Sequence, residues 1–172
     1  MTSPAADPEP LRAADLQLRG TAGPLRSRVY WPRASSRTSP GTPAPAVLVW
    51  FPDVVAPVPD GDAFVRALCS PAGLVVVSVG YRPPPEHAVA DAAGATAWVA
   101  DHAAELEADA GRLVVGGTGA GAALARFVAD RAAAEGWPPI AHVLLPHAGT
   151  TPAAAVAELR AALAGPVAGA GS

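Results

Sequence analysis

The chain has 172 residues, a length that fits one domain and leaves little room for a second. Its composition is 51% hydrophobic and 16% charged, which provides a core and excludes a disordered chain. The net charge of −3 and the scattered arginines, with no basic block, give nucleic-acid binding no electrostatic support.

Targeting and redox signals are few. Cys69 is the single cysteine, so no intrachain disulfide can form. Residues 1–10 hold prolines and acids where a signal peptide would have a basic and then an apolar run. No apolar stretch is long enough to span a bilayer. We therefore expect a cytoplasmic protein that makes no membrane contact.

The N-terminal part predicts a short antiparallel hairpin. Residues 1–15 are expected to form a flexible arm. Leu16–Leu18 and Arg26–Trp31 are predicted to be strands, separated by a turn at Gly20–Pro24. Residues 34–45 are rich in Ser, Thr, Pro and Gly, which is typical of an exposed loop.

From residue 46 onward, apolar runs alternate with alanine-rich segments, which predicts βαβ units and a mostly parallel sheet flanked by helices, an α/β fold. The predicted strands are Ala46–Phe51, Leu74–Val79, Leu113–Val115 and Ile140–Leu145. The predicted helices are Asp60–Cys69, Ala88–Leu106, Ala120–Ala134 and Ala153–Leu163. These elements place one domain at 16–164 and a flexible Gly/Ala tail at 165–172.

Several motifs occur in the order and spacing of one known family. The segment YRPPPEH at Tyr81–His87 resembles the YRLAPEH segment of the hormone-sensitive-lipase-like esterases. Trp98-Val99 and DAGRL at Asp109–Leu113 lie where that family has its RWV helix and its DPxRL turn. GGTGAGAAL at Gly116–Leu124 lies where the family has GGDSAGGNL. The resemblance implies a truncated α/β-hydrolase fold.

The resemblance also locates the family's catalytic positions. The nucleophile elbow is a strained strand-to-helix turn that exposes a serine hydroxyl, and this sequence has Gly119 at the serine position. Glycine has no side chain, so no acyl-enzyme can form there. The oxyanion segment HGGG is replaced by Pro52–Val55, and Asp53 adds a negative charge where negative charge should be stabilised.

The family's triad acid and histidine follow later strands, for which the chain has few residues left after Leu145. A Thr118–His147 dyad is a weak substitute, because threonine needs a base in hydrogen-bond contact. The resemblance gives His87 a structural role, since in the family the Glu and His of this motif tie the loop down.

The remaining candidate residues and motifs fit structural roles better than functional ones. His102 is expected on a solvated helix face, His142 in a strand with no second ligand nearby, and Cys69 in the core. The pattern Gly117-x-Gly119-x-x-Ala122 fits a dinucleotide fingerprint, but it follows the third buried strand instead of the first. We therefore predict no catalytic, cofactor-binding or metal-ligating residue, and no cofactor.

These observations favour an esterase-like family member that is catalytically inactive, or the product of a decaying gene. Two alternatives stay open: a non-catalytic module that binds a partner or a small acyl or alcohol ligand, and residual carboxylic-ester hydrolase activity completed by a partner chain. Ile140–Leu145 would form an uncharged apolar edge of the truncated sheet, so we also expect self-association.

Overall fold

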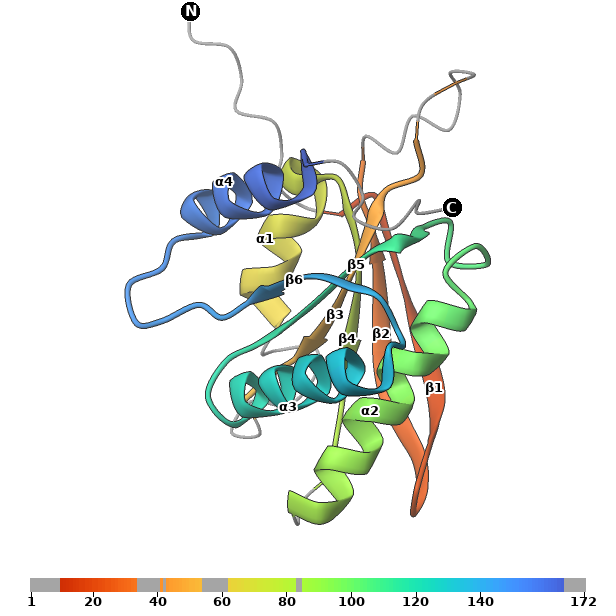
Figure 1. Ribbon diagram of the computed structural model, residues 1–172. Coiled ribbons are helices and arrows are strands. Elements are labelled where there is room, and N and C mark those ends of the chain that lie inside the picture. Colours follow the sequence, from red (N-terminus) through yellow and green to blue (C-terminus); the bar gives the residue numbers. More distant parts are fainter. Residues whose placement is uncertain (1–9, 34–40, 42, 54–61, 83–84, 166–172) are drawn as a thin grey trace, which may run out of the picture.

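The computed structural model describes residues 10–33, 41, 43–53, 62–82 and 85–165. Its centre is one sheet of six strands in the order β1-β2-β4-β3-β5-β6 (Figure 1). The strands are β1 (Arg12–Gly20), β2 (Gly23–Trp31), β3 (Ala46–Phe51), β4 (Leu74–Val79), β5 (Asp109–Gly117) and β6 (Ile140–Leu144). The helices are α1 (Ala63–Ala72), α2 (Pro85–Asp101), α3 (Ala120–Glu135) and α4 (Pro152–Leu163).

The predicted N-terminal hairpin is present and longer than expected. β1 and β2 pair antiparallel from Arg12 opposite Trp31 to Gly20 opposite Gly23. The strand therefore includes residues 12–15, which the sequence placed in the arm, because these residues pair with the second half of β2. β2 in turn pairs antiparallel with β4 and joins the hairpin to the main sheet.

The rest of the sheet is parallel, as the alternation of strands and helices predicts. β3 lies between β4 and β5, and β6 follows β5. Every residue of β3 and of β4 is buried, which explains why these two strands are apolar at every position except Ser78. β5 begins earlier than predicted, because Asp109 pairs with Ala46 ahead of a register shift.

Helix α2 differs from its prediction, since it begins at Pro85 and ends at Asp101 instead of continuing to Leu106. The chain then turns, and Glu107 has a φ of 66°. The carbonyl of Leu106 accepts a hydrogen bond from Trp31 Nε1 at 2.9 Å, so β2 contacts the turn that follows the helix.

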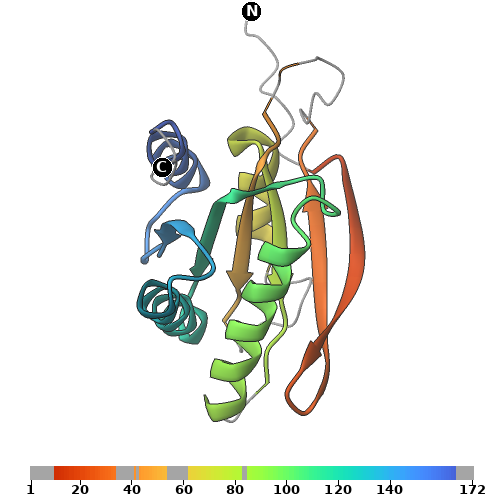
Figure 2. The same ribbon diagram turned by 45° about the vertical axis from the view of Figure 1, so that its right-hand side comes forward.

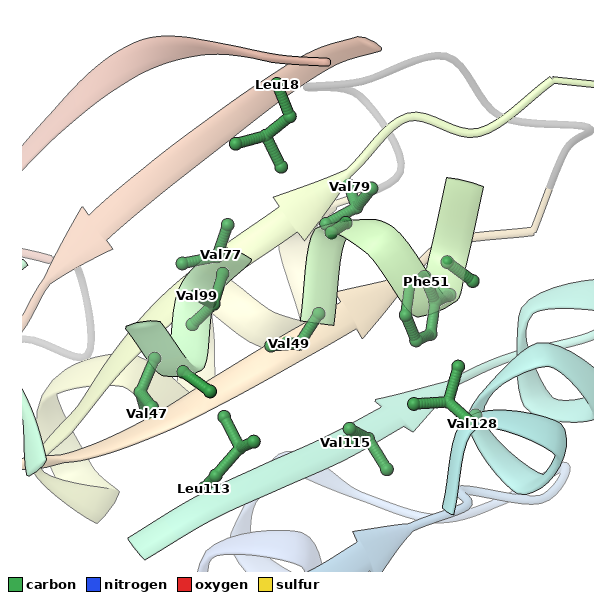
Figure 3. Close-up of a cluster of buried hydrophobic side chains, with 14 of the residues drawn as sticks. Leu18, Val47, Val49, Phe51, Val77, Val79, Val99, Leu113, Val115 and Val128 are labelled. Atoms are coloured by element: carbon green, nitrogen blue, oxygen red, sulfur yellow. The ribbon is translucent and has the colours of Figure 1, made fainter. Parts of the chain in front are cut away.

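Helices α2 and α3 cover one face of the sheet, and α1 and α4 cover the other (Figures 1 and 2). Side chains of α2 and α3 pack with one face of the strands into the larger core, part of which Figure 3 shows. Side chains of α1 and α4 pack on the other face with Trp50 and Leu48. None of the described helices is long and apolar enough to cross a membrane.

Candidate functional site

The turn from β5 to α3 carries the geometry of a nucleophile elbow. β5 ends at Gly117, α3 begins at Ala120, and Gly119 between them has φ 54° and ψ −125°. A positive φ strains residues other than glycine, and such strain is characteristic of this strand-to-helix turn. The amide of Thr118 donates to the carbonyl of Phe51 at 3.3 Å, which holds the turn against the end of β3.

Two further glycines let the backbone segments of this turn approach closely. A Cβ atom on Gly117 would lie 2.6 Å from the carbonyl oxygen of Phe51. A Cβ atom on Gly121 would overlap the same carbonyl oxygen. The first turn of α3 therefore packs directly on the end of β3, and only glycine fits at positions 117 and 121 without displacing backbone.

Asp53 lies over the apex of the elbow. A Cβ atom on Gly119 would collide with Asp53 Oδ2 and would lie 3.1 Å from Oδ1. The chain before Asp53 is held by Tyr81, whose hydroxyl donates to the carbonyl of Pro52 at 2.7 Å and whose ring packs edge-on against Phe51. Val54 and Val55, which complete the segment that replaces the oxyanion glycines, lie outside the described residues.

The charge of Asp53 suits a helix terminus and not an oxyanion. A carboxylate near the N-terminus of α3 interacts favourably with the partial positive charge of the helix dipole. A second negative charge in the same place would be repelled. The elbow therefore offers backbone geometry, one carboxylate and the hydroxyl of Thr118, while its apex has no side chain.

The structure places Thr118 and His147 in different segments, Thr118 in the elbow between β5 and α3 and His147 after β6. His147 lies in the exposed loop after β6, and its Nδ1 is 3.0 Å from the carbonyl of Ala148. The His147 amide donates to Thr150 Oγ1 at 3.1 Å. Among the described contacts, no hydrogen bond joins Thr118 to His147.

The YRPPPEH segment is held by residues other than those the resemblance indicated. Glu86 and His87 are both exposed in the first turn of α2. Arg82 instead pairs with the buried carboxylate of Asp91 at 3.3 Å. Asp91 also accepts the amide and the hydroxyl of Thr21, at 3.0 and 3.1 Å, and so joins α2 to the hairpin. The sequence signal for this contact is weak: Asp91 is the acid in the middle of an alanine-rich helix that also has Glu86 and Asp101 near its ends.

Two histidines have partners that the sequence did not indicate. His102 is half-buried, and its ring stacks on Trp98 with a centroid distance of 4.2 Å, so the expected solvated face is wrong. His142 Nε2 lies 2.7 Å from Glu158 Oε1, an ion pair between β6 and α4 when the histidine is protonated. Within the described ranges, no three His, Cys, Asp or Glu side chains are grouped as metal ligands would be.

A buried carboxylate at the start of α1 was missed by sequence reasoning. Asp62 is 0% exposed and accepts hydrogen bonds from Tyr30 Oη at 2.8 Å and from Ser78 Oγ at 2.6 Å. Burial raises the pKa of Asp62 above its ordinary value, although the two hydrogen bonds act in the opposite direction. Burial and the bond to Asp62 likewise raise the pKa of Tyr30.

Cys69 lies in the same core, as predicted, and its thiol is 3.2 Å from the carbonyl of Leu74. Burial raises the pKa of this thiol to about 12, so it is not poised as a nucleophile.

Comparisons with known proteins connect this arrangement to a family. A family model described as alpha/beta hydrolase fold matches residues 54–168. Esterase LipI of Mycobacterium tuberculosis is 39% identical over 142 residues, which are 78% of this chain and 43% of that protein. A hyperthermophilic esterase from the archaeon Pyrobaculum calidifontis has a solved structure with a TM-score of 0.65 and 35% identity, covering 77% of this chain and 44% of that one.

A thermophilic carboxylesterase cloned from a metagenomic library gives a TM-score of 0.68 at 33% identity, over 79% of this chain and 46% of its own. The chain therefore spans less than half the length of these relatives, within which the fold of the shared part is preserved.

Proposed function

The chain belongs to the α/β-hydrolase-fold family, among its hormone-sensitive-lipase-like esterases, and we propose that it does not hydrolyse esters through the covalent route of those enzymes. The observation that supports this proposal is Gly119 at the apex of the elbow, with φ 54° and ψ −125°. Covalent ester hydrolysis needs a side-chain nucleophile at this apex, and glycine has none.

Asp53 supports the same proposal independently. Its carboxylate lies where a side chain on residue 119 would begin. The tetrahedral intermediate of acyl transfer carries a negative charge that must be stabilised by donors. A carboxylate in this position repels that charge. The missing nucleophile and the electrostatics of the elbow therefore both disfavour the reaction.

Gly119 also weighs against activity completed by a partner chain. Another polypeptide can bring a histidine or a carboxylate to an elbow, but the nucleophile has to come from the turn itself. Binding of a small acyl or alcohol ligand, and the cytoplasmic location expected from the sequence, stay predictions.

The test is an assay of purified protein with p-nitrophenyl acetate and p-nitrophenyl butyrate, with bovine serum albumin as the control. We expect release of p-nitrophenol no faster than with albumin, and no covalent adduct by mass spectrometry after treatment with a serine-directed phosphonate. Saturable turnover that the phosphonate abolishes would overturn the proposal. Turnover lost in Thr118→Ala and in His147→Ala would assign it to the dyad and equally contradict us.

A further inference from the structure

The hairpin of β1 and β2 has one face in the core and one face exposed to solvent. Leu18 and Leu25 belong to the larger core, which includes side chains of α2 and α3. Because side chains alternate between the two faces of a strand, Gln17, Arg19 and Arg26 lie on the opposite face, where all three are exposed. Figure 2 shows the hairpin at the side of the molecule away from α3 and α4. The exposed face is therefore formed by polar residues of two paired strands.

The strand register gathers on this face three arginines that are scattered in the sequence. Arg26 lies opposite Gln17, and Arg19 is two residues further along β1 on the same face. Arg19 and Arg26 are therefore diagonal neighbours about 7–8 Å apart. Arg28 follows Arg26 on the same face of β2, about 7 Å along the strand. The long arginine side chains can direct their guanidinium groups to one ligand over such distances.

Two of the three arginines have no acidic partner among the described residues. Arg28 Nη1 forms an ion pair with Asp15 Oδ1 at 3.1 Å, and its guanidinium lies 6.0 Å from the centre of the Tyr30 ring. Arg19 and Arg26 form no ion pair with any residue that the structure describes. Like charges on neighbouring positions of one sheet face repel each other. An anion bound between Arg19 and Arg26 would remove that repulsion.

The acidic groups near this face do not neutralise it. Asp62 is fully buried and accepts its hydrogen bonds from Tyr30 and Ser78. The carboxylate of Asp15 is already engaged by an arginine of β2. Arg66 of α1 lies close enough to Tyr30 and Asp62 to act on both electrostatically, and it adds a further positive charge beside the hairpin. This face is therefore cationic, although the chain as a whole has a net charge of −3.

We propose that this face of the hairpin binds the phosphate group of a small molecule between Arg19 and Arg26, with Arg28 at the border of the site. A phosphate group with nearly two negative charges matches two unpaired arginines, and guanidinium groups bind phosphate oxygens in bidentate geometry. The amide of Gln17, opposite Arg26, can donate a further hydrogen bond. Because the site is exposed, we expect a dissociation constant of about 0.1–1 mM for inorganic pyrophosphate. The site uses no residue of the elbow, so its test is independent of ester hydrolysis.

The test is a titration of isotope-labelled protein with inorganic phosphate and with pyrophosphate, followed by NMR at constant ionic strength. We expect saturable shifts of the amides around Arg19 and Arg26, with pyrophosphate binding more tightly than phosphate because it carries more charge. Arg26→Gln removes one charge from the site. Arg126→Gln is the matched control, since Arg126 is equally exposed and has no partner among the described residues, but lies on α3. Arg26→Gln should weaken binding at least about tenfold, and Arg126→Gln should leave it unchanged.

A second pair of variants should strengthen binding at one position only. Asp15→Asn releases Arg28 from its ion pair and should tighten pyrophosphate binding about threefold. Asp130→Asn makes the same change of net charge at an exposed residue of α3 and should have no effect. All four variants should keep the circular dichroism of the wild type, because each change lies on the surface.

Three outcomes would overturn the proposal. The first is the absence of saturable shifts at pyrophosphate concentrations tenfold above the expected dissociation constant. The second is an equal change in a variant and its control, which would mean that net charge alone governs binding. The third is binding to vesicles of phosphatidylserine and phosphatidylcholine without binding of phosphate or pyrophosphate, which would assign the face to a membrane surface instead.

Discussion

The elbow at Gly119 follows β5, and the cluster around Asp62 includes Ser78 near the carboxyl end of β4, on the other side of β3; the two sites differ in what they retain. The elbow has the backbone geometry of a catalytic turn with no side chain at its apex. The Asp62 cluster has a carboxylate with two hydroxyl donors in short hydrogen bonds, but the carboxylate is fully buried and out of reach of a substrate.

The difference shows that backbone geometry and side-chain chemistry are maintained by separate forces. The elbow depends on the close approach of Gly117 and Gly121 to Phe51, which is a packing requirement of the fold. The Asp62 cluster exists because a buried carboxylate must have its acceptors satisfied. Neither requirement is catalytic, so a chain can keep both features without any activity.

The largest effect is expected where the elbow contacts β3. Gly121→Ala should lower the free energy of unfolding by about 3 kcal/mol, because its methyl group would overlap the carbonyl oxygen of Phe51. Gly94→Ala in α2 is the control, since no atom lies within 4 Å of a Cβ at that position. Alanine there should stabilise the helix by about 0.5–1 kcal/mol. Urea denaturation distinguishes the two, and equal effects would disprove the close approach at the elbow.

The contribution of the Asp62 cluster to the free energy of unfolding should depend on pH. Asp62→Asn leaves one hydroxyl without its acceptor and should cost about 2 kcal/mol in acid. The folded pKa of Asp62 is raised, so its stabilising contribution is present below its ordinary pKa and is lost as pH rises through the raised value.

The cost of Asp62→Asn should therefore shrink as the pH rises from about 4 through the raised pKa of Asp62, because the wild type alone loses stability from this group. Unfolding free energies of both proteins across this range provide the measurement. A cost that grows with pH would mean that Asp62 is stabilised as the carboxylate.

A smaller effect is expected at the apex of the elbow. Gly119→Ser should cost about 1–2 kcal/mol, because the new Cβ takes a positive φ and meets the carboxylate of Asp53. In the double variant with Asp53→Ala, about 1 kcal/mol of that cost should be recovered. A double-mutant cycle measured by urea denaturation gives the coupling, and strict additivity would show that the two positions do not touch.

The smallest expected effect is on activity. Gly119→Ser should not produce turnover, because the new hydroxyl has no described histidine within hydrogen-bond reach and triad members act as a unit. Hydrolysis of p-nitrophenyl acetate should stay at the level of albumin in Gly119→Ser and also in the double variant with Asp53→Ala. Multiple turnovers in either protein would reveal a base that the elbow geometry does not indicate.

Much of the fold could be predicted from local patterns. The bounds of β3 and β4 agree with the predicted runs, because both strands are buried on both faces and their one polar residue, Ser78, has its hydroxyl bonded to Asp62. The end of α2 could not be predicted, since the alanine-rich sequence continues past Asp101 and alanine suits a helix.

In the candidate site, too, some features could be predicted from the sequence and others depend on tertiary contacts. Glycine at position 119 is read directly from the motif, but the carboxylate of Asp53 above it depends on the pairing of β3 with β5. Asp62 gives no local signal, because its partners Tyr30 and Ser78 lie on two other strands.

The sequence by itself determined the order of strands and helices, the α/β class, the family resemblance and the residue at the apex of the elbow, because each of these is encoded in contiguous residues. The tertiary structure alone decided where Asp53 lies and from which hydroxyls Asp62 accepts hydrogen bonds. Those features depend on residues that are distant in the chain and meet only after the strands have paired and the two cores have been buried.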